Sequence, residues 1–387
     1  MTTLRPRTRR WKRPNFWLGK LIPGLLVLFG YSGYRLVLLD VYPLIKSRDA
    51  RVAYAYMSWV NSMLVLVAYS YSRVYFHGRD SSPGDTRIPQ QVQARRVVFA
   101  CDQAGLPLRC FLDDCNGRFL SIRTRHCRDC GTCRPGFDHH CSFMDNCVAT
   151  SSTFKPFVNF LLYAVLLLVV ALVPLVPLQL RAFREVVATT WRTERMHREW
   201  WSRWYSWAGG PVWRYAGALV RGYAQYPSVA HDRAFLVDGH RVETLVRDGV
   251  TYAYDVPLYP NLATPTLSTL AIVVFATLIV GIGIAMLVVV VLNARKGMSA
   301  VEVERARRHR LASPGPPPSS RDYDARLRLW IPLPDDPGEA NTQRREAQGA
   351  VVLVEPGTAL FDFGPERNWK NLMGQHWLEW FIPTRIP

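Results

Sequence analysis

The chain has 387 residues, a formal net charge of +18 and 49% hydrophobic residues. This length could hold two or three soluble domains, but long apolar stretches occupy much of it and argue against a wholly soluble protein. The positive charge is spread over segments that flank those stretches. It therefore indicates contact with anionic lipid, and we expect no nucleic-acid partner.

Two apolar segments follow a basic N-terminal arm. The first, residues 21–39, is interrupted by Arg35, and the second, residues 52–71, contains Asn61. Both segments are flanked by charged residues and by the Trp and Tyr residues typical of a membrane interface. We therefore predict two transmembrane helices within residues 17–75.

A cysteine-rich segment comes next. Seven cysteines and three histidines lie between Cys110 and Cys147. Two tetrahedral zinc sites would use eight of these ten side chains and leave one thiol and one imidazole. A thiol with a spare imidazole and a neighbouring carboxylate is a nucleophile with a base and an orienting group. The run Asp138-His139-His140-Cys141 contains all three kinds of side chain.

The pattern Cys127-x2-Cys130-x2-Cys133 is open to two interpretations. Three thiols at this spacing are easily divided between two metals, whereas a C-x2-C pair in the cytosol can also be a redox motif. The additional Cys and His residues nearby favour zinc. All eight cysteines precede residue 148, and the long loop after the third apolar segment has none. Thiols gathered on a reducing face favour metal binding or chemistry over disulfides.

Two further apolar segments, residues 157–180 and 267–292, contain no charged residue. Each is long enough to cross a hydrocarbon core of about 30 Å. The loop between them is rich in Trp and Tyr. We interpret these aromatic residues as an interfacial belt or the packing of a small subdomain, and a carbohydrate platform is the less favoured alternative. In the tail, residues 313–320 have the composition of a linker.

Basic residues precede the first span and follow the second and the fourth. By the positive-inside rule these three regions are cytoplasmic, so we expect both termini and the cysteine-rich module to face the cytoplasm of an endomembrane or the plasma membrane. The expected fold class is a mainly α membrane protein with four transmembrane helices and a loop-rich two-zinc module. The predicted boundaries are a basic arm (1–16), transmembrane helices 1–2 (17–75), the cytoplasmic module (76–153), helix 3 (154–180), a lumenal Trp-rich loop (181–266), helix 4 (267–293) and a cytoplasmic tail (294–387).

With these elements in view, the sequence resembles the DHHC protein S-acyltransferase (palmitoyltransferase) family. The module matches its signature in order and spacing through His126-Cys127, Cys130, Cys133, Asp138-His139-His140-Cys141 and Asn146-Cys147-Val148. The tail resembles fungal members through Asp362-Phe363-Gly364, Asn368-Trp369-Lys370, Gly374 and Trp380-Phe381-Ile382-Pro383.

The resemblance implies two structural zinc ions and a division of their ligands. One ion would be held by Cys110, Cys115, His126 and Cys133, and the other by Cys127, Cys130, His140 and Cys147. The resemblance also implies that Cys141, His139 and Asp138 are free of metal, which agrees with the count of side chains given above.

The resemblance further implies a two-step activity, with acyl-CoA as co-substrate and membrane lipid and protein substrates as partners. The Cys141 thiolate would take a fatty acyl group such as palmitoyl from acyl-CoA and pass it to a cysteine of a cytoplasmic or membrane-associated protein. His139 would accept the thiol proton, and Asp138 would fix the His139 tautomer. The anionic coenzyme needs cations, and the nearby candidates are Arg123, Arg125, Arg128 and Arg134, for which solvated charge is the alternative.

The chain departs from the family pattern at several positions. Its first ligand pair is Cys110-x4-Cys115, where C-x2-C is usual, and Cys101 is a possible substitute ligand. Ser142-Phe143 replaces Pro-Trp after the nucleophile, Ser152 stands where an Asn is expected, and the usual Thr-Thr-x-Glu appears as Ser299-Ala300-Val301-Glu302. These departures suggest a divergent, slow or selective member. The alternatives are a catalytically silent zinc-binding membrane scaffold and, less favoured, a membrane thiol oxidoreductase.

Overall fold

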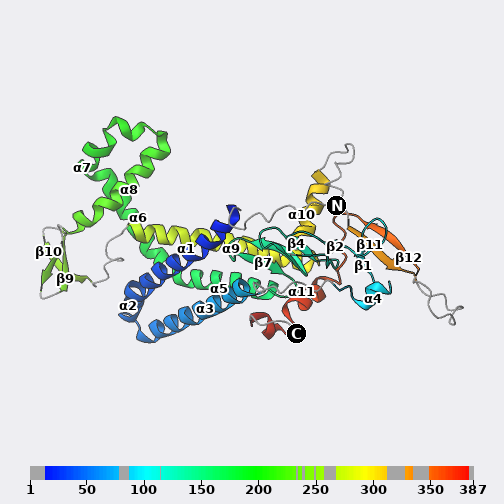
Figure 1. The fold of residues 1–387 in the computed structure, drawn as a ribbon. Coiled ribbons are helices and arrows are strands. Elements are labelled where there is room, and N and C mark those ends of the chain that lie inside the picture. Colours follow the sequence, from blue (N-terminus) through cyan, green and yellow to red (C-terminus); the bar gives the residue numbers. More distant parts are fainter. Residues whose placement is uncertain are drawn as a thin grey trace. The chain divides into compact units, whose positions relative to one another are not determined.

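The structure is a computed structural model, and the fold is shown in Figure 1. It describes residues 14–77, 87–113, 115–231, 234–237, 240–247, 250–256, 267–311, 327–333 and 348–382. Most of the basic arm and the linker predicted at residues 313–320 lie outside these ranges. The chain divides into two compact units, each considered by itself. The first comprises Met1–Gly24, Leu66–Leu162 and Ala285–Pro387, and the second comprises Leu25–Val65 and Tyr163–Ile284.

Within the described ranges, four helical segments are long and apolar enough to cross a membrane. They are Leu21–Lys46, Ala50–Phe76, Phe154–Leu172 and Leu267–Arg295. The first is built from α1 (Pro14–Leu36), the π-helical turn η2 (Val37–Val41) and α2 (Tyr42–Lys46), and the others are α3, α5 and α9. The predicted fold class is confirmed, because the structure is mainly helical with four such helices and a cysteine-rich module.

The segment predicted as one span at residues 154–180 contains two helices. Helix α5 ends at Leu172, and α6 (Leu175–Arg192) begins after a turn at Val173 and Pro174. Proline has no backbone N–H and clashes with the preceding helical turn, which explains why the helix is interrupted at this point.

The second unit has an apolar core and a hydrogen bond between two of its helices. Leu36, Val41, Leu175 and Val273 form one of its buried clusters. The Tyr34 hydroxyl donates to Asn61 Oδ1 at 3.0 Å, which links α1 to α3 and gives the amide in the second span a partner. An apolar cavity of about 90 Å³ lies between α1, α3, α5 and α9.

The Trp-rich segment of this unit is folded and helical. It contains α6, α7 (Glu194–Met196), η3 (His197–Trp201), η4 (Trp204–Trp207) and α8 (Gly210–His231). Met196, Trp200, Trp201 and Ala218 form a small buried core, so some of the tryptophans pack a subdomain. Trp204 is 80% exposed and does not. Strands β8 (Ala234–Val237), β9 (His240–Arg247) and β10 (Val250–Val256) form an antiparallel sheet in the order β10-β9-β8.

In the first unit, the cysteine-rich module is built from three small antiparallel hairpins. They pair β2 (Arg109–Cys110) with β3 (Arg118–Phe119), β4 (Arg125–Cys127) with β5 (Thr132–Arg134), and β6 (Phe137–Cys141) with β7 (Asn146–Ala149). Asn116 and Gly117 both have positive φ, at 46° and 84°, and Arg118 N donates to Cys115 O. The tight turn that Asn-Gly predicts is present.

Two apolar clusters hold the module to the rest of this unit. The larger contains Val74 of α3, Met144 and Val148 of the module, Phe157 of α5 and Met373 of the tail. The smaller contains Val92, Phe99, Cys101 and Trp330. The β6–β7 hairpin therefore packs against helix ends and against the tail.

The tail returns to the module through a mixed set of short elements. It contains α10 (Ala300–Leu311), β11 (Leu327–Pro332), β12 (Gly349–Val354), α11 (Pro365–Met373) and η6 (Trp377–Phe381). Strand β1 (Phe99–Cys101), which follows the short helix α4 (Gln90–Gln93), joins two tail strands in the order β1-β11-β12.

Candidate active site and metal centres

The first Cys/His cluster brings together Cys110, Cys115, His126 and Cys133. The Nδ1 atom of His126 lies 3.5 Å from the Cys110 sulfur, 3.4 Å from that of Cys115 and 3.8 Å from that of Cys133. The longer interval between the first two cysteines thus still delivers both sulfurs to one point. Cys101, the possible substitute, lies in the apolar cluster around Trp330 instead.

A carboxylate supports this cluster from the other side of the imidazole. The Nε2 atom of His126 lies 3.0 Å from Asp113 Oδ2. Asp113 belongs to the four-residue interval between Cys110 and Cys115 and has a φ of 46°. A carboxylate bound to the outer nitrogen of a ligating histidine fixes its tautomer and orientation. The residues between Cys110 and Cys115 therefore supply a carboxylate that interacts with His126. The sequence analysis did not identify Asp113.

The second cluster brings together Cys127, Cys130, His140 and Cys147. The Nδ1 atom of His140 lies 3.5 Å from the sulfurs of Cys127 and Cys130 and 3.9 Å from that of Cys147. The backbone N–H of Cys130 also donates to the Cys127 sulfur at 3.4 Å. Hydrogen bonds from Cys127 and Cys147 lower the pKa of the Cys130 thiol, and those with Cys127 and Cys130 raise the pKa of Cys147.

Both clusters fit a tetrahedral zinc ion. With Zn–S bonds of about 2.3 Å and Zn–N bonds of about 2.0–2.1 Å, neighbouring ligand atoms lie roughly 3.5–3.8 Å apart. In each cluster all four ligand atoms lie within 4.8 Å of one another. Three thiols and one imidazole are the donors that zinc prefers in structural sites. A cation at each point would also stabilise thiolates that otherwise compete for ionisation.

Strand β6 directs the histidine of the second cluster and the Cys141 thiol to opposite faces. Successive side chains of a strand point to opposite faces, so His139 and Cys141 share one face while His140 points to the other. The β6–β7 register shifts between Phe137 and His139, which places a bulge at Asp138. A bulge re-aims a side chain, and Asp138 Oδ2 lies 2.7 Å from His139 Nδ1 although the two residues are neighbours.

Burial and two partners, Asp138 and Cys141, set the pKa of His139. Burial lowers its pKa, but hydrogen bonds with Asp138 and Cys141 and their negative charges raise it more strongly, to about 9. Since Nδ1 faces Asp138, Nε2 is the nitrogen left for the Cys141 sulfur. The ring also packs edge-to-face on Phe157 at 5.4 Å, which holds its plane. The arrangement can keep the His139 imidazole protonated beside the Cys141 sulfur.

The second oxygen of Asp138 anchors the first turn of α10. Asp138 Oδ1 accepts a hydrogen bond from the Ala300 N–H at 2.8 Å. Ser299 Oγ accepts from the Glu302 N–H at 3.3 Å, and Glu302 Oε2 accepts from the Ser299 N–H at 2.7 Å. The divergent Ser-Ala-Val-Glu segment thus forms a capping box at the start of α10. Ala300 contributes a backbone group, and its missing hydroxyl is not needed for that contact.

Arg123, one of the arginines considered for coenzyme binding, makes structural contacts with the C-terminal part of the chain. Its guanidinium pairs with Glu302 at 2.8 Å, donates to the Gly297 carbonyl and lies 4.0 Å from the centre of the Phe361 ring. Arg125 lies opposite Arg134 in the β4–β5 register. Burial, followed by the charge of Arg305, lowers the pKa of Arg125 to about 10. Of the other two candidate arginines, Arg134 is half-buried and Arg128 is exposed.

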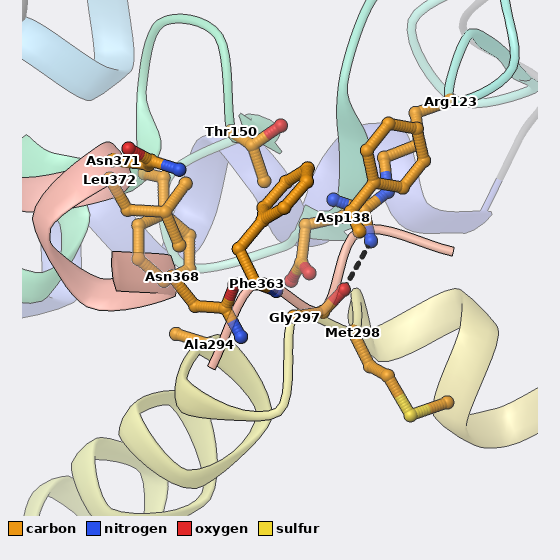
Figure 2. A pocket seen from close by; sticks show the side chains of 12 residues that line it. Arg123, Asp138, Thr150, Ala294, Gly297, Met298, Phe363, Asn368, Asn371 and Leu372 are labelled. Carbon is orange, nitrogen blue, oxygen red and sulfur yellow. Dashed lines mark hydrogen bonds between the residues drawn. The ribbon is translucent and has the colours of Figure 1, made fainter. Parts of the chain in front are cut away.

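A cavity of about 170 Å³ lies beside Asp138, between the module, the end of α9 and the tail (Figure 2). Asn368 closes one side of it. Its Nδ2 donates to Arg295 O at 2.9 Å and to Asp362 Oδ1 at 2.8 Å. The tail residues that resemble fungal members therefore tie α11 to the end of α9, next to the Asp138 carboxylate.

Cys141 is 5% exposed and lies where the hairpin meets the helix ends of the first unit. The Tyr71 hydroxyl donates to Phe143 O at 3.0 Å. The Asn146 amide donates to the carbonyls of Val74 at 2.7 Å and His77 at 2.8 Å. The two Asn146 bonds satisfy carbonyls at and just beyond the end of α3, and with the Tyr71 bond they position the turn that follows the thiol.

Comparisons with known proteins agree with this geometry. Residues 109–202 match the family model described as DHHC palmitoyltransferase. This segment is a DHHC domain. The resemblance seen in the sequence is confirmed.

Several curated palmitoyltransferases are similar to this chain over limited lengths. Palmitoyltransferase ZDHHC17 of Rattus norvegicus is 28% identical over 113 residues, 28% of this chain and 18% of the relative. Palmitoyltransferase AKR1 of Mortierella alpina is 29% identical over 101 residues, 25% and 18% respectively. Palmitoyltransferase ZDHHC15 of Xenopus laevis is 26% identical over 170 residues, 39% and 48%. The chain thus spans about a fifth of the first two relatives and about half of the third.

Proposed function

We propose that this chain is a protein S-acyltransferase that moves a fatty acyl group, such as palmitoyl, from acyl-CoA to cysteines of protein substrates by a two-step ping-pong mechanism. The observation that supports this proposal best is the Asp138–His139–Cys141 arrangement. One carboxylate oxygen lies 2.7 Å from the imidazole, the imidazole interacts with the Cys141 thiol, and eight other side chains form the two metal-type clusters.

In the first step the Cys141 thiolate attacks the thioester carbonyl carbon of acyl-CoA. A new carbon–sulfur bond forms, the bond to the coenzyme sulfur breaks, and that sulfur leaves with the electron pair. His139 gives its proton to the leaving thiolate, and Asp138 keeps the ring oriented throughout. One thioester replaces another, so the enzyme must supply positioning and a thiolate more than driving force.

In the second step a cysteine thiol of a protein substrate gives its proton to His139. Its sulfur attacks the acyl-Cys141 thioester, and Cys141 leaves as the thiolate, which restores the starting state. The N–H of Ala300 and the guanidinium of Arg123, acting through Glu302, hold Asp138 and the α10 terminus in place during both steps.

Two zinc ions are proposed as structural cofactors, held by the two clusters named above. When bound, zinc would supply folding free energy to a module that has small hairpins and little apolar core. The ligand His140 and the ligand Cys147 lie in β6 and β7, so the second ion would also fix the strand that carries Cys141.

The four apolar helices support an integral membrane protein. From the distribution of basic residues we propose that both termini and Cys141 face the cytoplasm of an endomembrane or the plasma membrane, with membrane lipid as a partner. Protein substrates would then be cytoplasmic or membrane-associated. An active thiol at the helix ends can receive a fatty chain whose tail stays in an apolar environment.

Mass spectrometry after exposure of the purified protein to palmitoyl-CoA tests the proposal. We expect one hydroxylamine-labile acyl adduct on Cys141, absent from Cys141→Ser and retained in Cys101→Ser, which changes a buried cysteine outside both clusters. If wild type with full zinc content forms no adduct, the alternative of a silent zinc-binding scaffold replaces the enzyme.

A further inference from the structure

The last described segment of the tail exposes large apolar side chains. It consists of η6 and the residue that follows it, and its exposed fractions are 63% at Trp377, 59% at Leu378, 47% at Phe381 and 50% at Ile382. The rings of Trp377 and Phe381 are in contact, with 6.5 Å between their centroids. A group of large exposed apolar side chains marks an interaction site.

The only charged residue in the sequence of η6 is turned inward. Glu379 is half-buried, and its carboxylate occupies the space that a Cβ on Gly374 would need. The charge of Glu379 interacts with that of Lys155, whose side chain is only 5% exposed. Acidic residues of soluble proteins are mostly exposed to water. The segment therefore withdraws its charge and presents its apolar side chains, as expected of a surface that contacts lipid.

Two contacts hold η6 beside the ends of the apolar helices. Lys155 lies in the first turn of α5, where the third candidate span begins. Trp380 packs against the larger of the two apolar clusters, which contains residues from the ends of α3, α5 and α9. Its Nε1 donates to Gly374 O at 2.9 Å, and its ring meets that of Trp369 edge-to-face. The segment thus lies at the level where the hydrocarbon of a membrane would begin.

The exposed apolar surface of α9 extends toward the same level. Val289 and Leu292 near its end are 55% and 49% exposed, as lipid-facing residues of a span are. Three residues after Leu292, the carbonyl of Arg295 accepts a hydrogen bond from Asn368 of α11 at 2.9 Å. Helix α11 leads directly into η6. Trp and other aromatic residues are enriched where a span meets the headgroups, so the continuity of the two surfaces identifies lipid as the occupant.

We propose that Trp377, Leu378, Phe381 and Ile382 insert into the interface of the bilayer leaflet next to the cysteine-rich module. Insertion would remove their apolar surface from water and hold the tail against the membrane, while Glu379 stays with Lys155 on the protein side. A soluble partner is a poorer match, because it would have to displace lipid from the ends of the spans. The proposal requires the four apolar helices to cross a membrane, and it does not depend on acyl transfer.

Fluorine NMR on the full chain in lipid nanodiscs tests this, with a single trifluoromethylphenylalanine introduced in place of Leu378. Its signal should be lost when the nanodiscs contain a lipid with a nitroxide on the upper acyl chain, and retained when a water-soluble nickel chelate is added. The matched control carries the probe in place of Leu333, which directly follows β11 and is 54% exposed. That signal should be retained with the nitroxide lipid and lost with the nickel chelate.

A second probe, in place of Trp377, guards against a local effect of replacing leucine, because here one aromatic ring replaces another. It should respond as the probe at Leu378 does. Loss of the two tail signals to the nickel chelate would place the segment in water and overturn the proposal. Tail signals retained with both agents would show that protein, such as a second copy of the chain, covers the segment, which overturns it too.

Self-acylation of Cys141 from palmitoyl-CoA, measured on the same nanodiscs, separates this proposal from the acyltransferase proposal. Both tail-probe variants should self-acylate as wild type does, because neither Trp377 nor Leu378 belongs to the cluster that contains Cys141. The expected nitroxide and nickel results in a wild-type chain that fails to self-acylate would leave the lipid contact intact and remove the enzyme.

Discussion

The two Cys/His clusters have the same donors, three thiols and one imidazole, but different places in the fold. The candidate ligands of the first lie in β2, β4, β5 and a loop, and its histidine contacts the Asp113 carboxylate. The second takes His140 from β6 and Cys147 from β7, the hairpin that carries Cys141. Identical chemistry therefore has different consequences, since only the second cluster holds the strand of the proposed nucleophile.

The largest expected effect is the loss of acyl transfer when the Cys141 thiol is removed, with both clusters left intact. Cys141→Ser should reduce acyl transfer to the background rate, because a serine hydroxyl is not ionised beside His139 at neutral pH. Zinc content should stay at two per chain, as measured by inductively coupled plasma mass spectrometry. Cys101→Ser is the control and should keep both activity and zinc. Loss of zinc in Cys141→Ser would mean that this sulfur is a ligand.

The two clusters are compared directly by Cys130→Ala and Cys110→Ala. Each should release one zinc ion, because a tetrahedral site with three ligands binds the ion more weakly. Cys130→Ala should also abolish self-acylation, since the β6–β7 hairpin loses its anchor. Cys110→Ala should slow it only by roughly tenfold, or about 1.4 kcal/mol of activation free energy. Equal losses of activity would erase the difference between the clusters.

The imidazole of His139 lies on the face of β6 opposite His140. It should affect the rate of self-acylation and not the zinc content. His139→Ala should slow self-acylation by about 10²–10⁴-fold, the usual contribution of a positioned acid–base group. Stopped-flow mixing with palmitoyl-CoA gives the rate, and zinc analysis should give two ions as in wild type. A normal rate would show that another group accepts the thiol proton.

The smallest effect concerns Asp113, which supports the first cluster alone. Asp113→Asn should weaken zinc retention there by about 10–100-fold, because the carboxylate fixes the orientation of the His126 ring. Competition with a chromogenic chelator measures the loss, and self-acylation should stay within a few-fold of wild type. Glu304→Gln, which changes an exposed carboxylate on α10, should retain zinc normally.

Local patterns made much of this structure predictable. Uncharged length marks the third and fourth apolar segments, and Cys and His spacing marks the two clusters, since each signal lies within a few tens of residues. The Asn116-Gly117 turn is predictable for the same reason. Asp113 could have been inferred, because an acidic residue inside a widened ligand interval is a candidate partner for a ligating histidine.

Other features depend on contacts between distant parts of the chain. Asp138 accepts from Ala300, 162 residues later, and β1 pairs with β11 across more than 220 residues. The Ser299–Glu302 pattern predicts a capped helix, but nothing in it names the carboxylate that the helix faces. The bulge at Asp138 and the helical fold of the Trp-rich segment likewise follow from packing that sequence spacing does not encode.

The central claim is that one sulfur carries the acyl group while six others, with two imidazoles, hold metal. Native mass spectrometry of the protein after brief exposure to palmitoyl-CoA tests this in single molecules. We expect molecules that carry two zinc ions and one acyl group together, with the acyl group on Cys141. Acylation confined to molecules that have lost a zinc ion would contradict the account.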